Sequence, residues 1–172
     1  MFEWITSKVV MSIAAIILII SIAGFFQLQR SSYEVTEFNN TAIAIANIVD
    51  DVSNSPANLK QNVTFGYGGG IKIMRNFRGN PYELEFLKDR IILRQGTTMV
   101  TKGFIKNVHL WKPETSKNIS EANRSTKEEL AKLDSDNKNL KFKSGNDFVI
   151  EGKLINVSGN NEFHTFIYLR KI

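Results

Sequence analysis

The chain has 172 residues, no cysteine and a formal net charge of +5. This length fits one domain with an appended segment and excludes two full hydrophobic cores. The lack of cysteine excludes disulfides, thiolate metal sites and a cysteine nucleophile. The apolar content of 42% and the charged content of 23% are those of a folded protein. The mean hydropathy of −0.16 resembles that of a soluble protein, but the apolar residues are concentrated near the N-terminus.

Residues 9–29 carry no charge and lie between Lys8 and Arg30. A helix of this length, at about 1.5 Å per residue, can cross a hydrocarbon core of about 30 Å. A cleaved secretory signal is the alternative, but its apolar region is usually about 7–15 residues long and precedes a small-x-small site. The nearest such sequence, Ser21-Ile22-Ala23, lies inside the apolar run. We therefore predict an uncleaved membrane span.

The membrane span is expected to continue into an amphipathic helix. No Pro or Gly interrupts positions 25–55, and Asn54-Ser55-Pro56 should end the helix near Ser53. Apolar residues recur at intervals of three and four, which forms one stripe on a helix: Val35, Phe38, Ala42, Ile45, Val49 and Val52. This helix-packing stripe has two possible partners, the chain's own β-strands or copies of the same helix in an assembly.

From residue 61 the periodicity changes to two, as in half-buried strands. The pattern predicts strands near 61–66, 70–75, 81–87, 90–95, 97–101, 103–110, 147–157 and 162–170. Turn residues join two pairs of them, at Lys88-Asp89 and at Ser158-Gly159-Asn160-Asn161. So many short strands predict an antiparallel sandwich or barrel.

A polar insertion interrupts the strands at residues 112–140. Within it, Ser125 and Glu128 have the spacing of a capping box, which predicts a short helix from Thr126 to Leu133 with Leu130 and Leu133 facing inward. The predicted fold class is therefore α+β: a long N-terminal helix over residues 1–55, then an antiparallel β-sandwich over residues 56–172.

Candidate chemistry is sparse. The run from Gly66 to Gly70 lacks the Lys-Ser/Thr of a phosphate loop and precedes a strand, so a turn is expected. Asp134, Asp136 and Asn137 resemble the start of a calcium loop, but Lys138 occupies its fifth position.

The two histidines, His109 and His164, lie in separate predicted strands, where they could meet across a sheet. No carboxylate completes a metal site with them at a recognisable spacing, and no serine has a nucleophile-elbow sequence. The sequence predicts no catalytic residue, no metal, no cofactor and no enzymatic activity.

The positive charge is spread along the chain. Its densest part is Lys138, Lys141 and Lys143, which is either a solvated loop or a contact with an anionic envelope layer or glycan. The pattern lacks the interleaved aromatic residues of nucleic-acid surfaces, so no nucleic acid partner is predicted.

Five N-x-Ser/Thr sequons are present, at Asn39, Asn62, Asn118, Asn123 and Asn156. They are either glycosylation sites or unmodified residues of asparagine-rich loops. One basic residue flanks each end of the apolar run, so only the amino terminus tips the balance toward a cytoplasmic N-terminus. Together these features favour an extracytoplasmic β domain.

The run SIAAIILIISIAGFF at 12–26, leading without a break into an amphipathic helix and then a small β domain, resembles archaeal type IV pilin-like proteins. That group includes archaellins and the membrane-anchored archaellum stator proteins. The resemblance implies a non-enzymatic role, in which helices bundle as a filament core or anchor a stator. One departure is the order Thr6-Ser7-Lys8-Val9, because processed members carry a small residue after the basic one.

We therefore expect a single-pass surface protein, a subunit or accessory of a pilus-like filament, assembled as a homo-oligomer through its N-terminal helix. The alternatives are a membrane-anchored stator-like module that binds the cell envelope or a surface layer, and a membrane-tethered ligand-binding or sensor domain.

Overall fold

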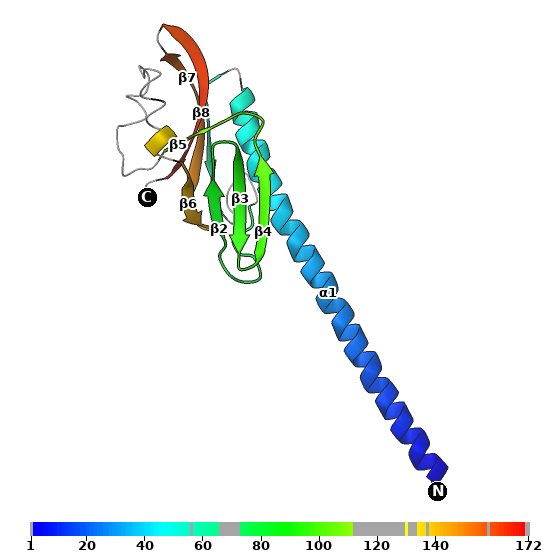
Figure 1. Ribbon diagram of the computed structural model, residues 1–172. Helices are drawn as coiled ribbons and strands as arrows, with labels where there is room; N and C mark the ends of the chain where they lie inside the picture. Colours follow the sequence, from blue (N-terminus) through cyan, green and yellow to red (C-terminus); the bar gives the residue numbers. More distant parts are fainter. Residues whose placement is uncertain are drawn as a thin grey trace. The chain divides into compact units, whose positions relative to one another are not determined.

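The computed structural model describes residues 2–55, 57–65, 73–111, 130, 134–136, 138–157 and 159–170. Within them the chain forms one long helix and a series of strands (Figure 1). The elements are α1 (Phe2–Asn54), β1 (Leu59–Val63), β2 (Glu83–Phe86), β3 (Arg90–Gln95), β4 (Thr98–Gly103), β5 (His109–Trp111), β6 (Leu140–Lys143), β7 (Phe148–Val157) and β8 (Asn160–Leu169).

The chain divides into two compact units, Met1–Glu37 and Phe38–Ile172. The second unit, which we call the β domain, contains the C-terminal turns of α1 together with all the strands. The helix ends at Asn54, one residue beyond the predicted end and just before Ser55-Pro56. The α+β class predicted from the sequence is confirmed, but the boundary between the units lies within the helix rather than after it.

The strands form two four-stranded sheets. The first has the order β1-β7-β8-β5 and the second has the order β4-β3-β2-β6. The predicted hairpin at residues 158–161 is confirmed, since β7 and β8 pair from Val157 with Asn160 onward and Gly159 adopts a left-handed φ of 90°. All pairs are antiparallel except β5 with β8, which is parallel, so the expectation of a wholly antiparallel sandwich is corrected at this pair.

The two sheets and the C-terminal turns of α1 share one hydrophobic core. Alternating residues of the second sheet face it, such as Leu84 and Phe86 on β2 and Ile91 and Leu93 on β3. A second, smaller cluster contains Leu130, Ile155, Val157 and Phe166, with Trp111 and Tyr168 packed against it. The insertion residue Leu130 thus covers the face of the first sheet that points away from the main core.

Three strand predictions differ from the structure. The expected strand 103–110 is reduced to β5, because Phe104 and Val108 donate their N–H groups to the carbonyls of Asp89 and Lys88 in the β2–β3 turn. The expected strand 70–75 is not formed in its described part, where Ile73 makes only an isolated bridge with Phe65. Conversely, β6 forms at the end of the expected polar insertion and pairs with β2.

Several predictions lie outside the described residues. They are the glycine run at 66–70, the capping-box residues Ser125 and Glu128, and most of the predicted helix 126–133. Within that helix Leu130 is described, and it is helical and buried as expected.

Candidate functional site

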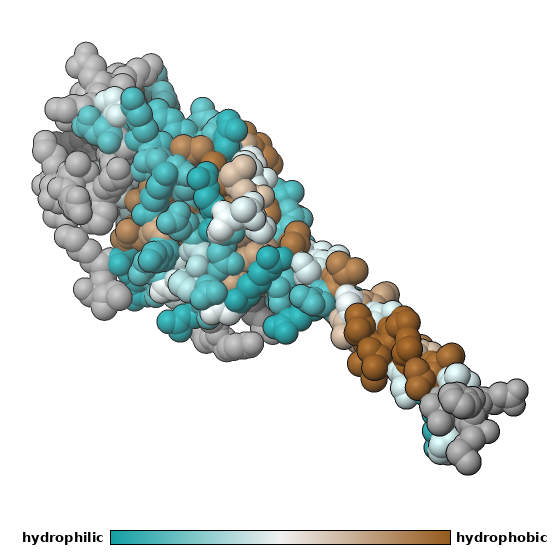
Figure 2. Space-filling view, turned by 60° about the horizontal axis from the view of Figure 1, so that its bottom comes forward, coloured by the Kyte–Doolittle hydropathy of each residue, from teal (hydrophilic) through white to brown (hydrophobic). Residues whose placement is uncertain are grey.

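The first unit presents an apolar surface that nothing in the described chain covers. We call residues 9–28 of α1 the apolar segment. Its large apolar side chains are between 47% and 74% exposed: Val9, Val10, Met11, Ile13, Ile16, Ile17, Leu18, Ile19, Ile20, Ile22, Phe25, Phe26 and Leu28. Figure 2 shows apolar side chains gathered on this part of the helix. Soluble monomers rarely expose so large a contiguous apolar surface, so this one requires lipid or protein around it.

The two serine hydroxyls inside the apolar segment are satisfied within the helix. The hydroxyl of Ser12 donates to the carbonyl of Lys8 at 2.9 Å, and that of Ser21 donates to the carbonyl of Ile17 at 2.8 Å. These bonds remove the cost of placing a hydroxyl where water is absent. Both serines are therefore compatible with hydrocarbon, and α1 is long and apolar enough to cross a membrane.

Aromatic and basic residues flank the apolar segment on both sides. The ammonium of Lys8 lies 4.1 Å from the centre of the Trp4 ring, and Arg30 pairs with Glu34 at 3.0 Å. Tyr33 is 69% exposed. At about 1.5 Å per residue, Trp4 and Tyr33 are separated by about 43 Å, which matches the 40–45 Å thickness of a bilayer with its headgroups. Trp and Tyr prefer those interfaces, a signal that the sequence prediction did not use.

The helix-packing stripe predicted from the sequence falls in two environments. Val35 is 40% exposed, whereas Phe38, Ala42, Ile45, Val49 and Val52 are fully buried in the core of the β domain. Phe38 stacks on Phe77 with ring centres 4.4 Å apart. Of the two partners left open, the chain's own β domain therefore covers the stripe from Phe38 onward. These five residues are not available to pack against copies of the helix.

Polar contacts fix the last turns of α1 to the strands. The hydroxyl of Ser53 donates to the carbonyl of Val49 and shares a buried 2.9 Å hydrogen bond with Thr165 on β8. The carboxylate of Asp50 accepts from the N–H of Ile105 at 2.8 Å. Asp50 therefore helps to fix the end of α1 to the segment that follows β4.

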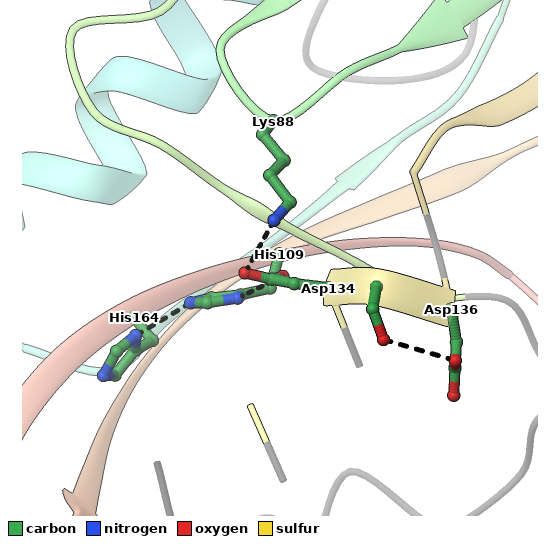
Figure 3. Close-up of polar contacts among 6 residues, drawn as sticks. Lys88, His109, Asp134, Asp136 and His164 are labelled. Atoms are coloured by element: carbon green, nitrogen blue, oxygen red, sulfur yellow. Dashed lines mark hydrogen bonds and ion pairs between the residues drawn. The ribbon is translucent and has the colours of Figure 1, made fainter. Parts of the chain in front are cut away.

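The two histidines meet across the parallel pair of β5 and β8, in the β domain. His109 Nε2 and His164 Nδ1 are 2.9 Å apart. His109 Nδ1 also lies 2.8 Å from Asp134 Oδ1, and the other oxygen of Asp134 is 3.0 Å from the ammonium of Lys88 (Figure 3). His164 Nε2 faces Glu162 Oε2 at 3.4 Å. We call these five residues the histidine cluster.

The histidine cluster joins three parts of the chain. Lys88 comes from the β2–β3 turn of the second sheet, Asp134 from a helical turn of the insertion, and the other members from β5 and β8 of the first sheet. Burial and the neighbouring His109 hold the pKa of His164 below its ordinary value, although Glu162 and Asp134 act in the opposite direction. The sequence indicated that the histidines could meet, but not that Lys88, Asp134 and Glu162 would join them.

No group of three or more potential metal ligands occurs among the residues that the structure describes. Asp134 is engaged by His109 and Lys88, and Asp136 accepts from the hydroxyl of Ser135 at 3.4 Å (Figure 3). Asn137, the third residue of the candidate calcium loop, is outside the described residues.

The sequons differ in accessibility. Asn62 is exposed on β1, at an edge of the first sheet. Asn39 is half-buried in α1, and Thr41 of the same sequon is buried, so this sequon is poorly placed for modification. Asn156 accepts from the N–H of Gly159 and donates to Asn161. Asn118 and Asn123 lie outside the described residues.

The lysines of the densest basic region lie on and before β6. Lys141 pairs with Glu85 at 3.1 Å, and Lys138 and Lys143 are exposed. The pairing of Lys141 lowers the positive charge available to an anionic partner.

Comparison of the chain with models of known protein families, with curated proteins and with solved structures finds no match.

Proposed function

We propose that this chain is a non-enzymatic, pilin-like surface protein that sits in the membrane through the apolar segment and assembles through it into a filament. The main support for this proposal is the division of α1 into two parts. Its C-terminal turns are buried in the β domain, while every described large apolar side chain between Val9 and Leu28 is exposed.

This division suits a subunit that moves between lipid and a helix bundle. A segment that is apolar on all sides can exchange lipid for neighbouring helices without exposing apolar surface to water. Because the β domain already covers its own part of α1, its fold does not depend on assembly. Contacts between subunits would then involve the apolar segment rather than the stripe from Phe38 to Val52.

The proposed orientation places the N-terminus in the cytoplasm and the β domain outside. The exposed sequon asparagine Asn62 supports this orientation, as an accessible acceptor on a sheet edge. The cell membrane, or a surface filament that emerges from it, is the corresponding location.

A second candidate is a membrane-anchored, stator-like module that remains a monomer in lipid and binds the envelope through its β domain. The order Lys8-Val9 favours it, because the basic residue is not followed by the small residue of processed pilin-like proteins. In this case the apolar segment would contact lipid only.

Disulfide cross-linking separates the two candidates. Because the chain contains no cysteine, any single cysteine introduced is the only one present. Five consecutive variants, from Ile16→Cys to Ile20→Cys, sample the full circumference of the helix, at about 100° per residue. Thr97→Cys, on an exposed turn of the β domain, is the control for random collision.

The five variants and the control are oxidised mildly in membranes, and the yield of disulfide-linked dimer is measured. If the chains self-associate through the apolar segment, the yields should exceed that of Thr97→Cys and should differ among the five positions. Yields equal to the control at all five positions would refute assembly through this segment and leave the anchored monomer. Electron microscopy of the purified protein should show filaments in the first case.

A further inference from the structure

The histidine cluster contains one buried atom that the neutral form of the site leaves without a hydrogen bond. That atom is His164 Nε2, which has no hydrogen-bond partner although it faces the Glu162 carboxylate at 3.4 Å. Buried polar atoms are usually paired, and an unpaired one calls for a specific explanation. The explanation lies in which ring nitrogens of the cluster carry protons.

The proton positions follow from the acceptor at one end. The Asp134 carboxylate can only accept, so His109 Nδ1 carries a proton and donates to it. In a neutral ring His109 Nε2 is then an acceptor, and His164 Nδ1 must donate to it across 2.9 Å. His164 Nε2 is consequently unprotonated, and its lone pair faces a carboxylate. A proton added at this nitrogen would turn an unfavourable contact into a charge-assisted hydrogen bond.

The added proton has two alternative positions. It can remain on His164, or it can move along the 2.9 Å contact so that His109 is the charged ring and donates to a neutral His164. In the second arrangement His164 Nε2–H still points at Glu162, and the His109 cation faces Asp134. Each arrangement places the positive ring next to one carboxylate.

The surrounding charges accommodate one proton and oppose a second. Lys88, Asp134 and Glu162 contribute one positive and two negative charges, a net of −1 when both rings are neutral. One proton brings the cluster to zero, whereas a second would place two charged rings 2.9 Å apart. Lys153 is opposite His164 on β7 and adds another positive charge to this face of the sheet.

We propose that the histidine cluster is a binding site for a single proton, shared between His109 and His164, that strengthens the attachment of the insertion to the two sheets. The attachment is stronger when the proton is bound because Asp134, which belongs to the insertion, then faces a histidine pair that carries positive charge. By linkage, the docked position of Asp134 raises the proton affinity of the pair, so mild acidification favours docking. This inference concerns the β domain alone and does not depend on the proposed assembly.

Selective isotope labelling offers a direct test, because the chain contains two histidines and only their rings would be observed. Ring-nitrogen chemical shifts of the full chain in detergent micelles, recorded from pH 8 to pH 5, report the protonation and tautomer of each ring. We expect the Nδ1–H tautomer in both rings at pH 8. On acidification both rings should shift together, with the uptake of one proton per chain. Independent titration of the two rings, or uptake of two protons in this range, would overturn the proposal.

Two variants extend the test. Asp134→Asn and Glu162→Gln should each move the shared titration to lower pH, because each removes a negative charge beside one of the two proton positions. Glu83→Gln is the matched control, since Glu83 is an exposed carboxylate on β2, in the second sheet. A shared titration that is unchanged by both cluster variants, with ring signals still those of the folded protein, would contradict the role of the carboxylates.

Discussion

Ile45 tests the assignment of the C-terminal turns of α1 to the β domain. Its side chain is fully buried among residues of both sheets. Ile45→Ala removes three carbon atoms, each worth about 0.8 kcal/mol of transfer free energy. The free energy of unfolding should therefore fall by at least about 2.4 kcal/mol. The cavity that remains adds to this value, and comparable core substitutions cost about 2–5 kcal/mol in total. For a domain of this size the melting temperature should fall by about 10 °C.

The fluorescence of Trp111 is a suitable probe of this loss. The chain has two tryptophans, so in a Trp4→Phe background only Trp111, in the β domain, reports on unfolding. Thermal and urea unfolding in mild detergent would be compared for Ile45→Ala and for Ile17→Ala. Ile17 is 58% exposed in the apolar segment and provides the same chemical change without burial in the β domain.

We expect a large loss of stability for Ile45→Ala and almost none for Ile17→Ala. Ile45→Asp should unfold the β domain, because it buries a charge without a partner. If Ile45→Ala left the unfolding transition unchanged but reduced assembly, the stripe would be a contact between subunits, and its assignment to the chain's own core would be refuted.

Three further predictions concern the β domain. Gly152→Ala should lower the free energy of unfolding in urea by about 1–3 kcal/mol, because the new Cβ would overlap the Phe163 ring. Adding Phe163→Ala should recover part of this loss. If the losses of the two single variants simply added in the double variant, the overlap would be contradicted. Acidification favours the docked over the undocked position of Asp134, but the unfolded chain still binds more protons than the folded one below pH 6.5, because the pKa of His164 is lowered in the fold. The unfolding free energy should therefore fall between pH 6.5 and pH 5, by at most about 1.4 kcal/mol per pH unit, and a slope that persists in His164→Asn would assign it to other groups. Tyr82→Phe should lower the free energy of unfolding by about 1–2 kcal/mol, since the buried hydroxyl donates to the carbonyl of Met74 at 2.5 Å. A melting temperature unchanged from that of the parent would refute this contribution.

Local patterns in the sequence were sufficient where a segment's neighbours lie close along the chain. The helix end near Ser53, the turn at Lys88-Asp89 and the β7–β8 hairpin are all confirmed. Each depends on residues within a few positions of one another, so periodicity and turn residues specify it. The apolar segment was predicted for the same reason, because its composition alone distinguishes it.

Contacts between distant segments could not be predicted in this way. The segment Leu140–Lys143 alternates apolar and charged residues, but it is short and lysine-rich, and it becomes a strand because β2 is available to pair with it. The histidine cluster likewise requires the parallel pairing of β5 with β8 and the approach of Asp134 from the insertion. No spacing in the sequence encodes either arrangement.

The order of strands in the first sheet has a consequence for how the protein is made. Both β1 and β5 pair with strands of the C-terminal hairpin, for example Leu59 with Gly152 and His109 with Phe166. During synthesis neither strand has a partner until β7 and β8 emerge, so closure of this sheet is nonlocal and slow relative to formation of the helix. Until then the apolar face of α1 from Phe38 to Val52 lacks the part of its cover that the first sheet provides. A nascent chain is therefore expected to be prone to aggregation before β7 and β8 have been made.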